Sequence, residues 1–545
     1  MSPTLHSTPS PPPRHRGRSA IAGSLAAVSA LLLSACGSGD GGTGTGSPSS
    51  GGTLTFAVGS DAGCVDPQQV GSNDTIYSTR QLVDSLTDQD PATGKIVPWL
   101  AESWTVSKDA TAFTFKLRPG VTFSDGTPLT AQVVKENFDA VPKLGIRALL
   151  AKSYLAGYAG TTVVDDHTAK VTFKQPNAQF LQASSTFSLG IESSATVRKT
   201  PEERCTKGVS GSGPFTLSSY VPNQSIALAR RTGYAWGSSL FKKKGEAYLD
   251  KLVFKIVSES GVRTGSLQSG QLDAIGSVGL ADEAALKGAG VRLQARANPG
   301  VVFGLGFNES RPLFQDEKVR QAISLAIDRA QIAGTVFPSG TKPATSVLSH
   351  TTPSYTDLSS RLALDKARAG SLLDEAGWKP GPDGIRSKNG AKLSFTITWA
   401  PVAATNQPSL ELIQQQLKAV GVDVTLKLIQ VAQFQVIQQK SDFDALWGNI
   451  TRADPDILRT SYSTALANIY RLPPSELDKL LDRQVAATDP AERAKLVGQA
   501  QQWIVEHAVV APVVELQTEL GVAKKVHDLT FDASSRIQLH DTWIG

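Results

Sequence analysis

LAESWTVSKDATAFTFKLRPGVTFSDGTPLTAQVVKEN, residues 100–137, carries the strongest local signals in this sequence of 545 residues. Apolar and polar residues alternate over residues 113–117, which predicts a strand with one buried face and one solvent-exposed face. Pro119-Gly120 predicts a turn, residues 121–123 resume the alternation, and Thr130 can cap a helix that follows. The pattern therefore predicts a hairpin followed by a helix, and it places no catalytic group among these residues.

The N-terminal residues have the pattern of an export signal. Three arginines precede an apolar run at residues 20–33, which is shorter than the roughly 20 residues needed to span a bilayer. The small residues before Cys36 resemble a lipobox, where a signal peptidase cuts before a cysteine that carries diacylglycerol. We therefore expect residues 1–35 to be a lipoprotein signal peptide and Cys36 to be the membrane anchor. An ordinary secretory signal with a chance cysteine is the alternative.

Residues 36–52 are rich in glycine and serine, which predicts a flexible tether. Without the signal peptide the chain keeps 51 basic and 49 acidic residues, and no basic stripe with interleaved aromatic residues points to a nucleic-acid partner. The 510 remaining residues are too many for one hydrophobic core and imply two or more domains. Cys64 and Cys205 are expected to form a disulfide in an oxidising compartment, and two free buried thiols are the alternative.

The motif LAESW and the pattern F-T-F-K-L-R-P-G-V-x-F-S-D-G-x-P-L-T-A-x-x-V, both within residues 100–137, resemble the signature of family 5 solute-binding proteins of ABC importers. This family includes oligopeptide, dipeptide and nickel-chelate receptors. Further blocks are similar to the family in the same order: GSGPF at 211–215, VRQAISLAIDR at 319–329 and LLDEAGW at 372–378. Asp316 and Asp489 can cap two helices in this part of the chain.

The resemblance implies an α/β, two-lobed periplasmic-binding-protein-like fold of the three-subdomain kind (type II, cluster C), with mixed sheets and a hinge between the lobes. The expected domains are lobe I from residues 53–92, 204–300 and 510–545, a small α/β subdomain at 93–203 attached to it, and lobe II at 301–509. A hinged cleft between lobes can desolvate a small ligand and report its presence by closing.

The resemblance also suggests where a ligand would be bound, since the family lines its cleft with segments equivalent to residues 399–403 and 446–455. Two tryptophans there would supply apolar walls or belong to the core, and polar residues would orient the ligand. The loop and first helix near the N-terminus add two weaker candidates, for which turn chemistry and core packing are the alternatives. The candidate ligand-binding residues are Asp61, Tyr77, Trp399, Trp447, Asn449, Thr451, Arg452 and Asp454.

One position departs from the family pattern. Peptide-binding members typically place an aspartate four residues before the proline of this loop, where it pairs with the α-amino group of the ligand, and Thr451 stands there in this chain. A neutral threonine does not offset the cost of desolvating an ammonium group. Asp454 or Asp456 could substitute if the loop is shifted, or the ligand could carry an anion that meets Arg452. No histidine near the loop supports nickel ligation.

No HExxH, GxSxG or phosphate-loop motif occurs, so we expect no enzyme, no metal and no cofactor. The expected function is capture of peptides or a peptide-like solute and delivery to an ABC permease with its ATPases. The expected location is the outer face of the cell membrane, where lipidated Cys36 would anchor a monomer. Two alternatives stay open: a secreted peptide or ester hydrolase, and a receptor that senses a peptide signal without importing it.

Overall fold

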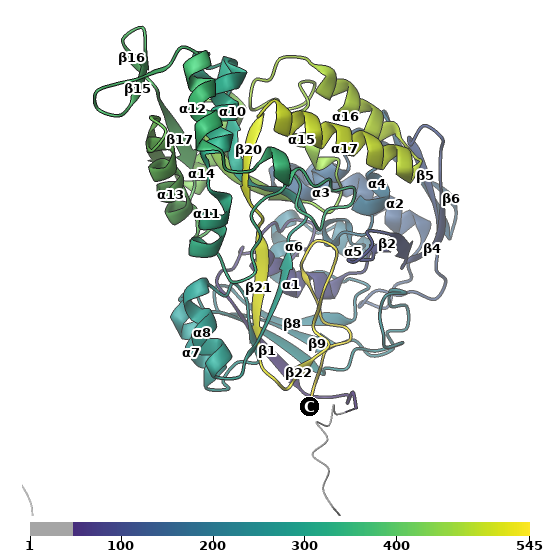
Figure 1. Cartoon of the computed structure of the whole chain (residues 1–545). Helices are drawn as coiled ribbons and strands as arrows, with labels where there is room; N and C mark the ends of the chain where they lie inside the picture. Colours follow the sequence, from purple (N-terminus) through teal and green to yellow (C-terminus); the bar gives the residue numbers. More distant parts are fainter. Residues whose placement is uncertain (1–46) are drawn as a thin grey trace, which may run out of the picture. The chain divides into compact units, whose positions relative to one another are not determined.

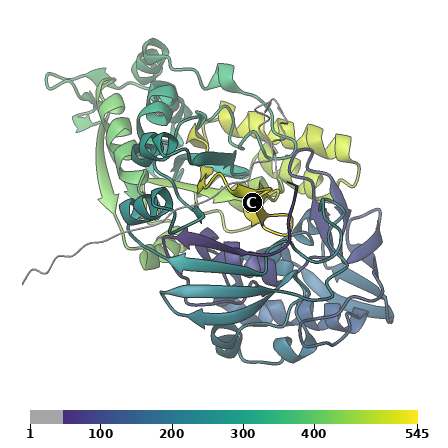
Figure 2. The same cartoon turned by 90° about the horizontal axis from the view of Figure 1, so that it is seen from below.

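The seven-stranded sheet of lobe I, as we name the part of the molecule built around it, combines strands from distant parts of the sequence. The structure is a computed structural model that describes residues 47–545 (Figure 1), so the predicted signal peptide and Cys36 lie outside the described residues. In spatial order the strands are β12 (Arg292–Ala297), β21 (Gln517–Val522), β11 (Ala274–Ile275), β1 (Thr53–Val58), β10 (Lys251–Ile256), β9 (Ser225–Arg230) and β8 (Phe215–Val221). Figure 2 shows strands of this sheet side by side.

Strand β1 is parallel to β10 and β11, and it is buried on both faces. Leu54 and Phe56 belong to the main core of lobe I, while Ala57 points to the other face and packs with Leu267 and Leu286. These two leucines come from α7 (Ser260–Gln268) and α8 (Leu280–Gly288), which pack together in Figure 1. The three consecutive buried apolar residues Phe56, Ala57 and Val58 are typical of a strand that is covered on both sides. Helix α1 (Asn73–Thr79) follows β1 in the chain and also belongs to lobe I.

The small subdomain has a four-stranded antiparallel sheet. Its strands, in spatial order, are β4 (Ala101–Val106), β5 (Ala112–Leu117), β7 (Thr168–Phe173) and β6 (Tyr158–Asp165). Its helices, with those that lead back to lobe I, are α2 (Ala131–Ala140), α3 (Leu149–Tyr154), α4 (Phe180–Ala183), α5 (Ser194–Val197) and α6 (Pro201–Lys207). The predicted strand at 113–117 is confirmed as β5, and the Oγ of Thr130 caps α2 by accepting from the Val133 backbone N–H.

The predicted hairpin partner of β5 is wrong. Strand β5 pairs with β4 and β7, whereas residues 121–123 close a tight turn of their own, in which Leu129 N donates to Val121 O at 2.9 Å. The turn between β4 and β5 is held by Asp109, whose carboxylate accepts from Ser107 Oγ at 2.6 Å. The hairpin therefore lies before Pro119-Gly120 and not around it.

Lobe II contains a five-stranded mixed sheet covered by helices. Its strands, in spatial order, are β18 (Asp423–Leu428), β17 (Ser394–Trp399), β19 (Ala445–Thr451), β13 (Gly300–Phe307) and β20 (Val510–Val514). Its helices are α9 (Pro312–Gln315), α10 (Glu317–Ala326), α11 (Arg329–Val336), α12 (Lys366–Glu375), α13 (Asn406–Lys418), α14 (Val431–Lys440), α15 (Ile457–Tyr462), α16 (Glu476–Ala486) and α17 (Pro490–Glu506). Buried residues of β13, β17 and β19 form its main core with α10, α11 and α13.

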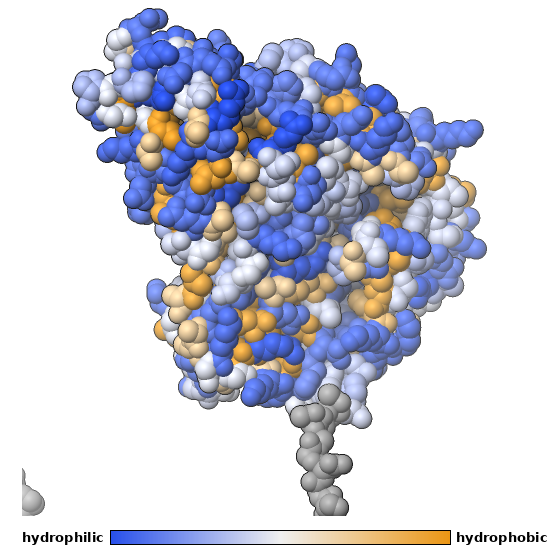
Figure 3. Space-filling view, in the orientation of Figure 1, coloured by the Kyte–Doolittle hydropathy of each residue, from blue (hydrophilic) through white to orange (hydrophobic). Residues whose placement is uncertain are grey.

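Short elements complete the fold. The small sheets are β14 (Lys379–Pro380) with β15 (Arg386–Lys388) and β16 (Ala391–Lys392), β2 (Thr87–Gln89) with β3 (Ile96–Pro98), β22 (Val526–His527) with β25 (Trp543–Ile544), and β23 (Thr530–Phe531) with β24 (Ile537–Gln538). Single 3-10 turns lie at Arg80–Leu82, Phe187–Leu189 and Ser359–Arg361, and a longer 3-10 segment at Val141–Ala148. The face drawn in Figure 3 is mostly hydrophilic with scattered hydrophobic patches. Among the described residues, no helix combines the length and apolarity that crossing a bilayer requires.

Two crossings of the chain connect the sheets of the two lobes. Strand β12 of lobe I leads through Asn298-Pro299 into β13 of lobe II, and β20 returns through Glu515-Leu516 into β21. The two crossings are bonded to each other, because Asn298 N donates to Leu516 O at 2.8 Å. Short paired connections of this kind are where a two-lobed protein can hinge.

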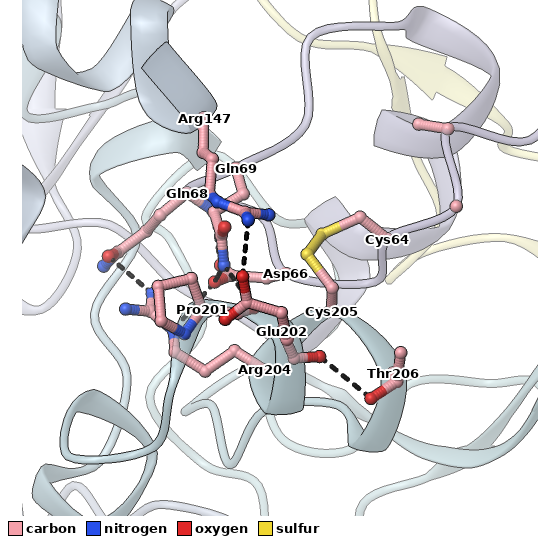
Figure 4. The surroundings of a disulfide bond; sticks show 12 residues. Cys64, Asp66, Gln68, Gln69, Arg147, Pro201, Glu202, Arg204, Cys205 and Thr206 are labelled. Atoms are coloured by element: carbon pink, nitrogen blue, oxygen red, sulfur yellow. Dashed lines mark hydrogen bonds and ion pairs between the residues drawn. A yellow bond between two sulfur atoms is a disulfide. The ribbon is translucent and has the colours of Figure 1, made fainter. Parts of the chain in front are cut away.

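A disulfide and a buried charge cluster fix the loop that follows β1 (Figure 4). Cys64 of this loop is joined to Cys205 of α6, with 4.0 Å between the Cα atoms. The neighbouring Arg204 lies between two carboxylates, with Nε 2.7 Å from Asp66 Oδ2 and Nη2 2.8 Å from Glu192 Oε2. The three side chains are at most 1% exposed, and burial raises the pKa of Glu192 well above its ordinary value.

We expect Arg204→Met to lower the free energy of unfolding by about 3–5 kcal/mol, because it leaves buried carboxylates without their counter-charge. Urea unfolding followed by tryptophan fluorescence measures the loss. The matched control is Arg147→Met, since the ion pair of Arg147 with Glu202 is half-exposed and is worth at most about 1 kcal/mol. Equal losses in the two variants would contradict this account of the buried cluster.

Candidate functional site

A cavity of about 760 Å³ opens where lobe I, the small subdomain and lobe II meet. This volume is in the range of sites for small organic ligands. Lobe I contributes residues 60, 68–74, 277 and 536, the small subdomain contributes residues 146–150, and lobe II contributes residues 402 and 449–451. The cavity is therefore built by segments that are far apart in the sequence.

The lobe I wall is the loop between β1 and α1, and the buried charge cluster holds it. Gln68 lines the cavity, while its Oε1 accepts from Arg204 Nη2 at 2.8 Å and its Nε2 donates to Asn137 Oδ1 at 2.9 Å. Asp74, in the first turn of α1, accepts from Ser60 Oγ at 2.8 Å. Asp74 has no ion-pair partner among the described residues, so its carboxylate is available to a ligand.

Arg536 is a functional candidate that the sequence did not reveal. Its side chain lines the cavity although only 6% of the residue is exposed, and its guanidinium carbon lies 5.0 Å from the centre of the Phe187 ring. It sits in the turn between β23 and β24, where its backbone N–H donates to Asp532 Oδ1 at 2.9 Å. The pattern Asp-Ala-Ser-Ser could suggest a turn, but no local pattern places that turn beside residues 68–74.

The lobe II wall comes from the end of β19. Asn449 and Thr451 line the cavity, as do the half-exposed Ile450 and, from the loop after β17, the exposed Val402. Thr451 is only weakly engaged, since its Oγ1 accepts from Asn298 Nδ2 at 3.4 Å. These positions agree with the region in which the sequence placed a ligand.

Trp399 and Trp447 do not line this cavity. Both lie in the hydrophobic core of lobe II, and the Trp447 ring stacks on Phe303 with the ring centres 5.3 Å apart. Trp447 Nε1 donates to Asn406 Oδ1 at 3.1 Å, which satisfies its polar atom inside the core. Their position corrects the expectation of apolar cleft walls and matches the alternative of core packing.

Arg452 connects lobe II to the small subdomain instead of facing the cavity. Its Nη2 donates to Ser153 Oγ at 2.6 Å and its Nη1 to Thr460 Oγ1 at 3.3 Å. Its guanidinium also lies over the ring of Tyr154, 4.7 Å from the ring centre. Arg452 does not line the cavity, and its charge has no ion pair within 4.0 Å among the described residues, so its expected role toward an anionic ligand stays a prediction.

Asp454 and Asp456, which follow Arg452 in the chain, already have arginine partners. Asp454 accepts two hydrogen bonds from Arg493, at 2.9 and 2.6 Å, and Asp456 pairs with Arg459 at 3.0 Å. Both carboxylates are buried. Neither is free to replace the aspartate that Thr451 lacks, so the expected role of Asp454 in ligand binding is corrected to a structural one.

Asp61 and Tyr77 have the structural roles that were their alternatives. The Asp61 carboxylate accepts from Tyr220 Oη at 2.8 Å and from the Asn223 backbone N–H at 2.9 Å, which pins the loop after β1. The Tyr77 ring is buried against Phe56 with ring centres 5.8 Å apart, and burial raises the pKa of its hydroxyl. Neither residue lines the cavity, although both neighbour the segments that do.

The chemistry of the cavity suits an organic ligand with charged, polar and apolar parts. Its charged residues are Asp74, Arg536 and Arg147, and the last of these pairs with Glu202. Ile146 and Leu149 present apolar side chains that are 81% and 54% exposed. No histidine or cysteine lines the cavity, and the described residues contain no group of three side chains suited to a metal ion.

Residues 95–468 match the family model for bacterial extracellular solute-binding proteins, family 5. The glutathione-binding protein GsiB of Escherichia coli O157:H7 is 28% identical, over 85% of this chain and 88% of that protein. Heme-binding protein A of Haemophilus influenzae is 29% identical, over 80% of this chain and 82% of that protein.

Solved structures of similar proteins share the fold. NikA from Brucella suis, in complex with Fe(III)-EDTA, has a TM-score of 0.79 at 23% identity and covers 91% of this chain and 100% of its own. The periplasmic binding protein DppA from Helicobacter pylori, in complex with the peptide STSA, has a TM-score of 0.74 at 22% identity, over 91% of this chain and 98% of its own. These likenesses confirm the predicted two-lobed α/β fold.

We expect Thr451→Asp to raise the affinity for short peptides with a free amino group by about tenfold, because a carboxylate here can pair with an ammonium in the cavity. Isothermal titration calorimetry measures the change. N-acetylated peptides and the variant Thr425→Asp, at an exposed position of β18 outside the cavity, serve as controls. An unchanged affinity removes the end of β19 from the ligand site.

Proposed function

This chain belongs to family 5 of the bacterial extracellular solute-binding proteins, and from this premise we propose that it captures peptides or peptide-like solutes for an ABC importer. Proteins of this family are substrate-binding components of ABC transporters, and the predicted absence of enzymatic activity is confirmed by the family match. In this function the chain binds a solute between its lobes and passes it unaltered to a permease, whose ATPases supply the energy.

The observation that carries the proposal is the cavity enclosed by all three parts of the molecule. A ligand in it touches both lobes at once, so that binding favours the closed arrangement over the open one. The paired crossings at Asn298-Pro299 and Glu515-Leu516 supply the hinge, and the hydrogen bond from Arg452 to Ser153 is a contact that opening would break. Closure then reports to the permease that the site is occupied.

The peptide-like nature of the solute is supported by the charges of the cavity and by two similar proteins. One relative is named for glutathione, and one similar structure contains a peptide. Asp74 on the lobe I wall accepts from Ser60 but has no ion-pair partner among the described residues. It can therefore receive the amino group of a ligand, the task that Thr451 cannot perform from lobe II. The exposed side chains of Ile146 and Val402 can pack against apolar side chains of a peptide.

Anchoring by a lipid at Cys36 completes the proposal. Lipidated Cys36 would hold the protein at the outer face of the membrane, and the glycine-rich residues 37–52 would let it reach the permease. A monomer is sufficient for this task, because each chain has a complete cavity of its own.

We expect the purified protein to become more compact when a pool of short peptides is added, and the peptides to be recovered unchanged. Small-angle X-ray scattering measures the radius of gyration, and mass spectrometry of the same sample measures the peptides. Hydrolysed peptides would contradict a binding function, and bound peptides without compaction would contradict closure of the lobes.

The anchor is tested by Cys36→Ser in a host that processes lipoproteins. We expect the wild-type chain in the membrane fraction and the variant in the soluble extracytoplasmic fraction, because the variant cannot receive diacylglycerol. Immunoblots of the two fractions make the comparison. A wild-type chain that is found in the soluble fraction together with the variant would support an ordinary secretory signal.

A further inference from the structure

We propose that Arg536 is the anion-binding residue of the cavity, and that the ligand carries a carboxylate that lies against the lobe I wall. The inference rests on the proposed function, since it assigns one chemical group to the solute that the cavity receives. The carboxylate can be the terminus of a peptide or an acidic side chain, and both offer the same two oxygens to a guanidinium.

The buried arginines of the described chain differ in the hydrogen bonds that their guanidinium groups donate. Each of the other eight donates at least two hydrogen bonds to protein atoms. They are Arg80, Arg204, Arg231, Arg263, Arg320, Arg329, Arg386 and Arg452. The guanidinium of Arg536 donates none to the described residues and has no ion pair within 4.0 Å among them. Its Nε is enclosed without a hydrogen-bond partner, as are the Nε atoms of Arg80, Arg263, Arg320 and Arg452, so the distinction lies in its two Nη groups.

A buried guanidinium that lacks an ion pair destabilises the protein unless another group supplies acceptors for its N–H groups. Removing a charged group from water without a partner costs several kcal/mol, and buried charges in proteins are therefore paired or hydrogen-bonded. The face of the Phe187 ring offsets part of this cost by a cation–π contact. Among the described residues no acceptor meets the two Nη groups, which are not enclosed by the protein as Nε is. The cavity that Arg536 lines is where a carboxylate can supply those acceptors.

Hydrogen bonds within its own turn hold the backbone of Arg536 in place. The Asp532 carboxylate stabilises this turn, because its Oδ1 accepts from the Ser534 N–H at 2.8 Å and from the Arg536 N–H at 2.9 Å. Asp532 N in turn donates to Arg536 O at 2.7 Å, next to the paired strands β23 and β24. Both bonds to the carboxylate end on Asp532 Oδ1, and Asp532 forms no ion pair with the guanidinium within 4.0 Å. A rigid turn of this kind presents Arg536 to the ligand at low entropic cost.

The other cations near the cavity already have protein partners. Arg147 is neutralised by Glu202, and Arg452 is bonded to Ser153 and Thr460. The acceptor for a cation, Asp74, lies on the same lobe I wall as Arg536. A ligand with both an ammonium and a carboxylate can therefore be oriented by lobe I alone, before lobe II closes over it.

The test compares the wild type with Arg536→Gln and with the matched control Arg483→Gln, since Arg483 is an exposed arginine that pairs with Glu492 and lies outside the cavity. Three pools of tetrapeptides serve as probes: one with free carboxyl termini, one amidated without acidic residues, and one amidated with a single glutamate. Calorimetry measures each affinity. We expect Arg536→Gln to lose about thirty-fold or more toward the pools that carry a carboxylate, and Arg483→Gln to stay within about threefold of the wild type.

The outcomes separate this inference from the function on which it rests. Binding of the free-terminus pool alone assigns the terminal carboxylate, and binding of the amidated glutamate pool assigns a side chain. If all three pools bind equally and Arg536→Gln binds as the wild type does, the anion site is overturned while peptide capture stands. If no pool binds the wild type, peptide capture itself is overturned.

Ligand-free stability gives a second and independent readout. The proteins are freed of co-purified solutes by dialysis from denaturant with the disulfide intact, and their melting temperatures are compared. We expect Arg536→Gln to melt no lower than the wild type, because it removes an unpaired buried charge. Arg329→Gln, which removes a buried arginine with five hydrogen bonds, should melt lower. An equal loss in the two variants, or a failure of Arg536→Gln to fold, overturns the proposal.

Discussion

The pairing of Arg204 with Asp66 and Glu192 is the interaction on which the ligand wall of lobe I depends. This charge cluster is buried against the loop that joins β1 to α1. Arg204 also donates to Gln68, and Gln68 lines the cavity. The disulfide between Cys64 and Cys205 holds the same loop to α6. A loop without regular secondary structure is thereby made rigid enough to present polar groups at fixed positions.

The requirement that a buried charge has a partner divides the charged groups around the cavity into two kinds. Charges that maintain the fold are saturated by protein partners, as Asp454 is by Arg493. Asp74 and Arg536 lack such partners among the described residues and both line the cavity, which is the arrangement expected of groups that await a ligand. Burial alone does not identify a binding residue. Burial together with an unmet hydrogen-bonding requirement does so more sharply.

Local sequence patterns predicted the parts of the fold that depend on neighbours in the chain. The strand β5, the cap of α2 at Thr130 and the caps at Asp316 and Asp489 follow from the side chains themselves. The pairing partner of β5 was missed because register and partner are decided by residues distant in the sequence. Asn449 and Thr451 were placed near the ligand by family resemblance, whereas Arg536 was not, since its role arises only when residues 68–74 and 536 come together.

The position of β21 within the sheet of lobe I has a consequence for how the protein reaches its mature state. This strand, residues 517–522, lies between β12 and β11, so the sheet stays open in its interior until that late segment has been delivered. A nascent polypeptide that lacks this strand cannot complete the sheet of lobe I. The sheet can therefore close only after all but the last 23 residues of the chain have been synthesised.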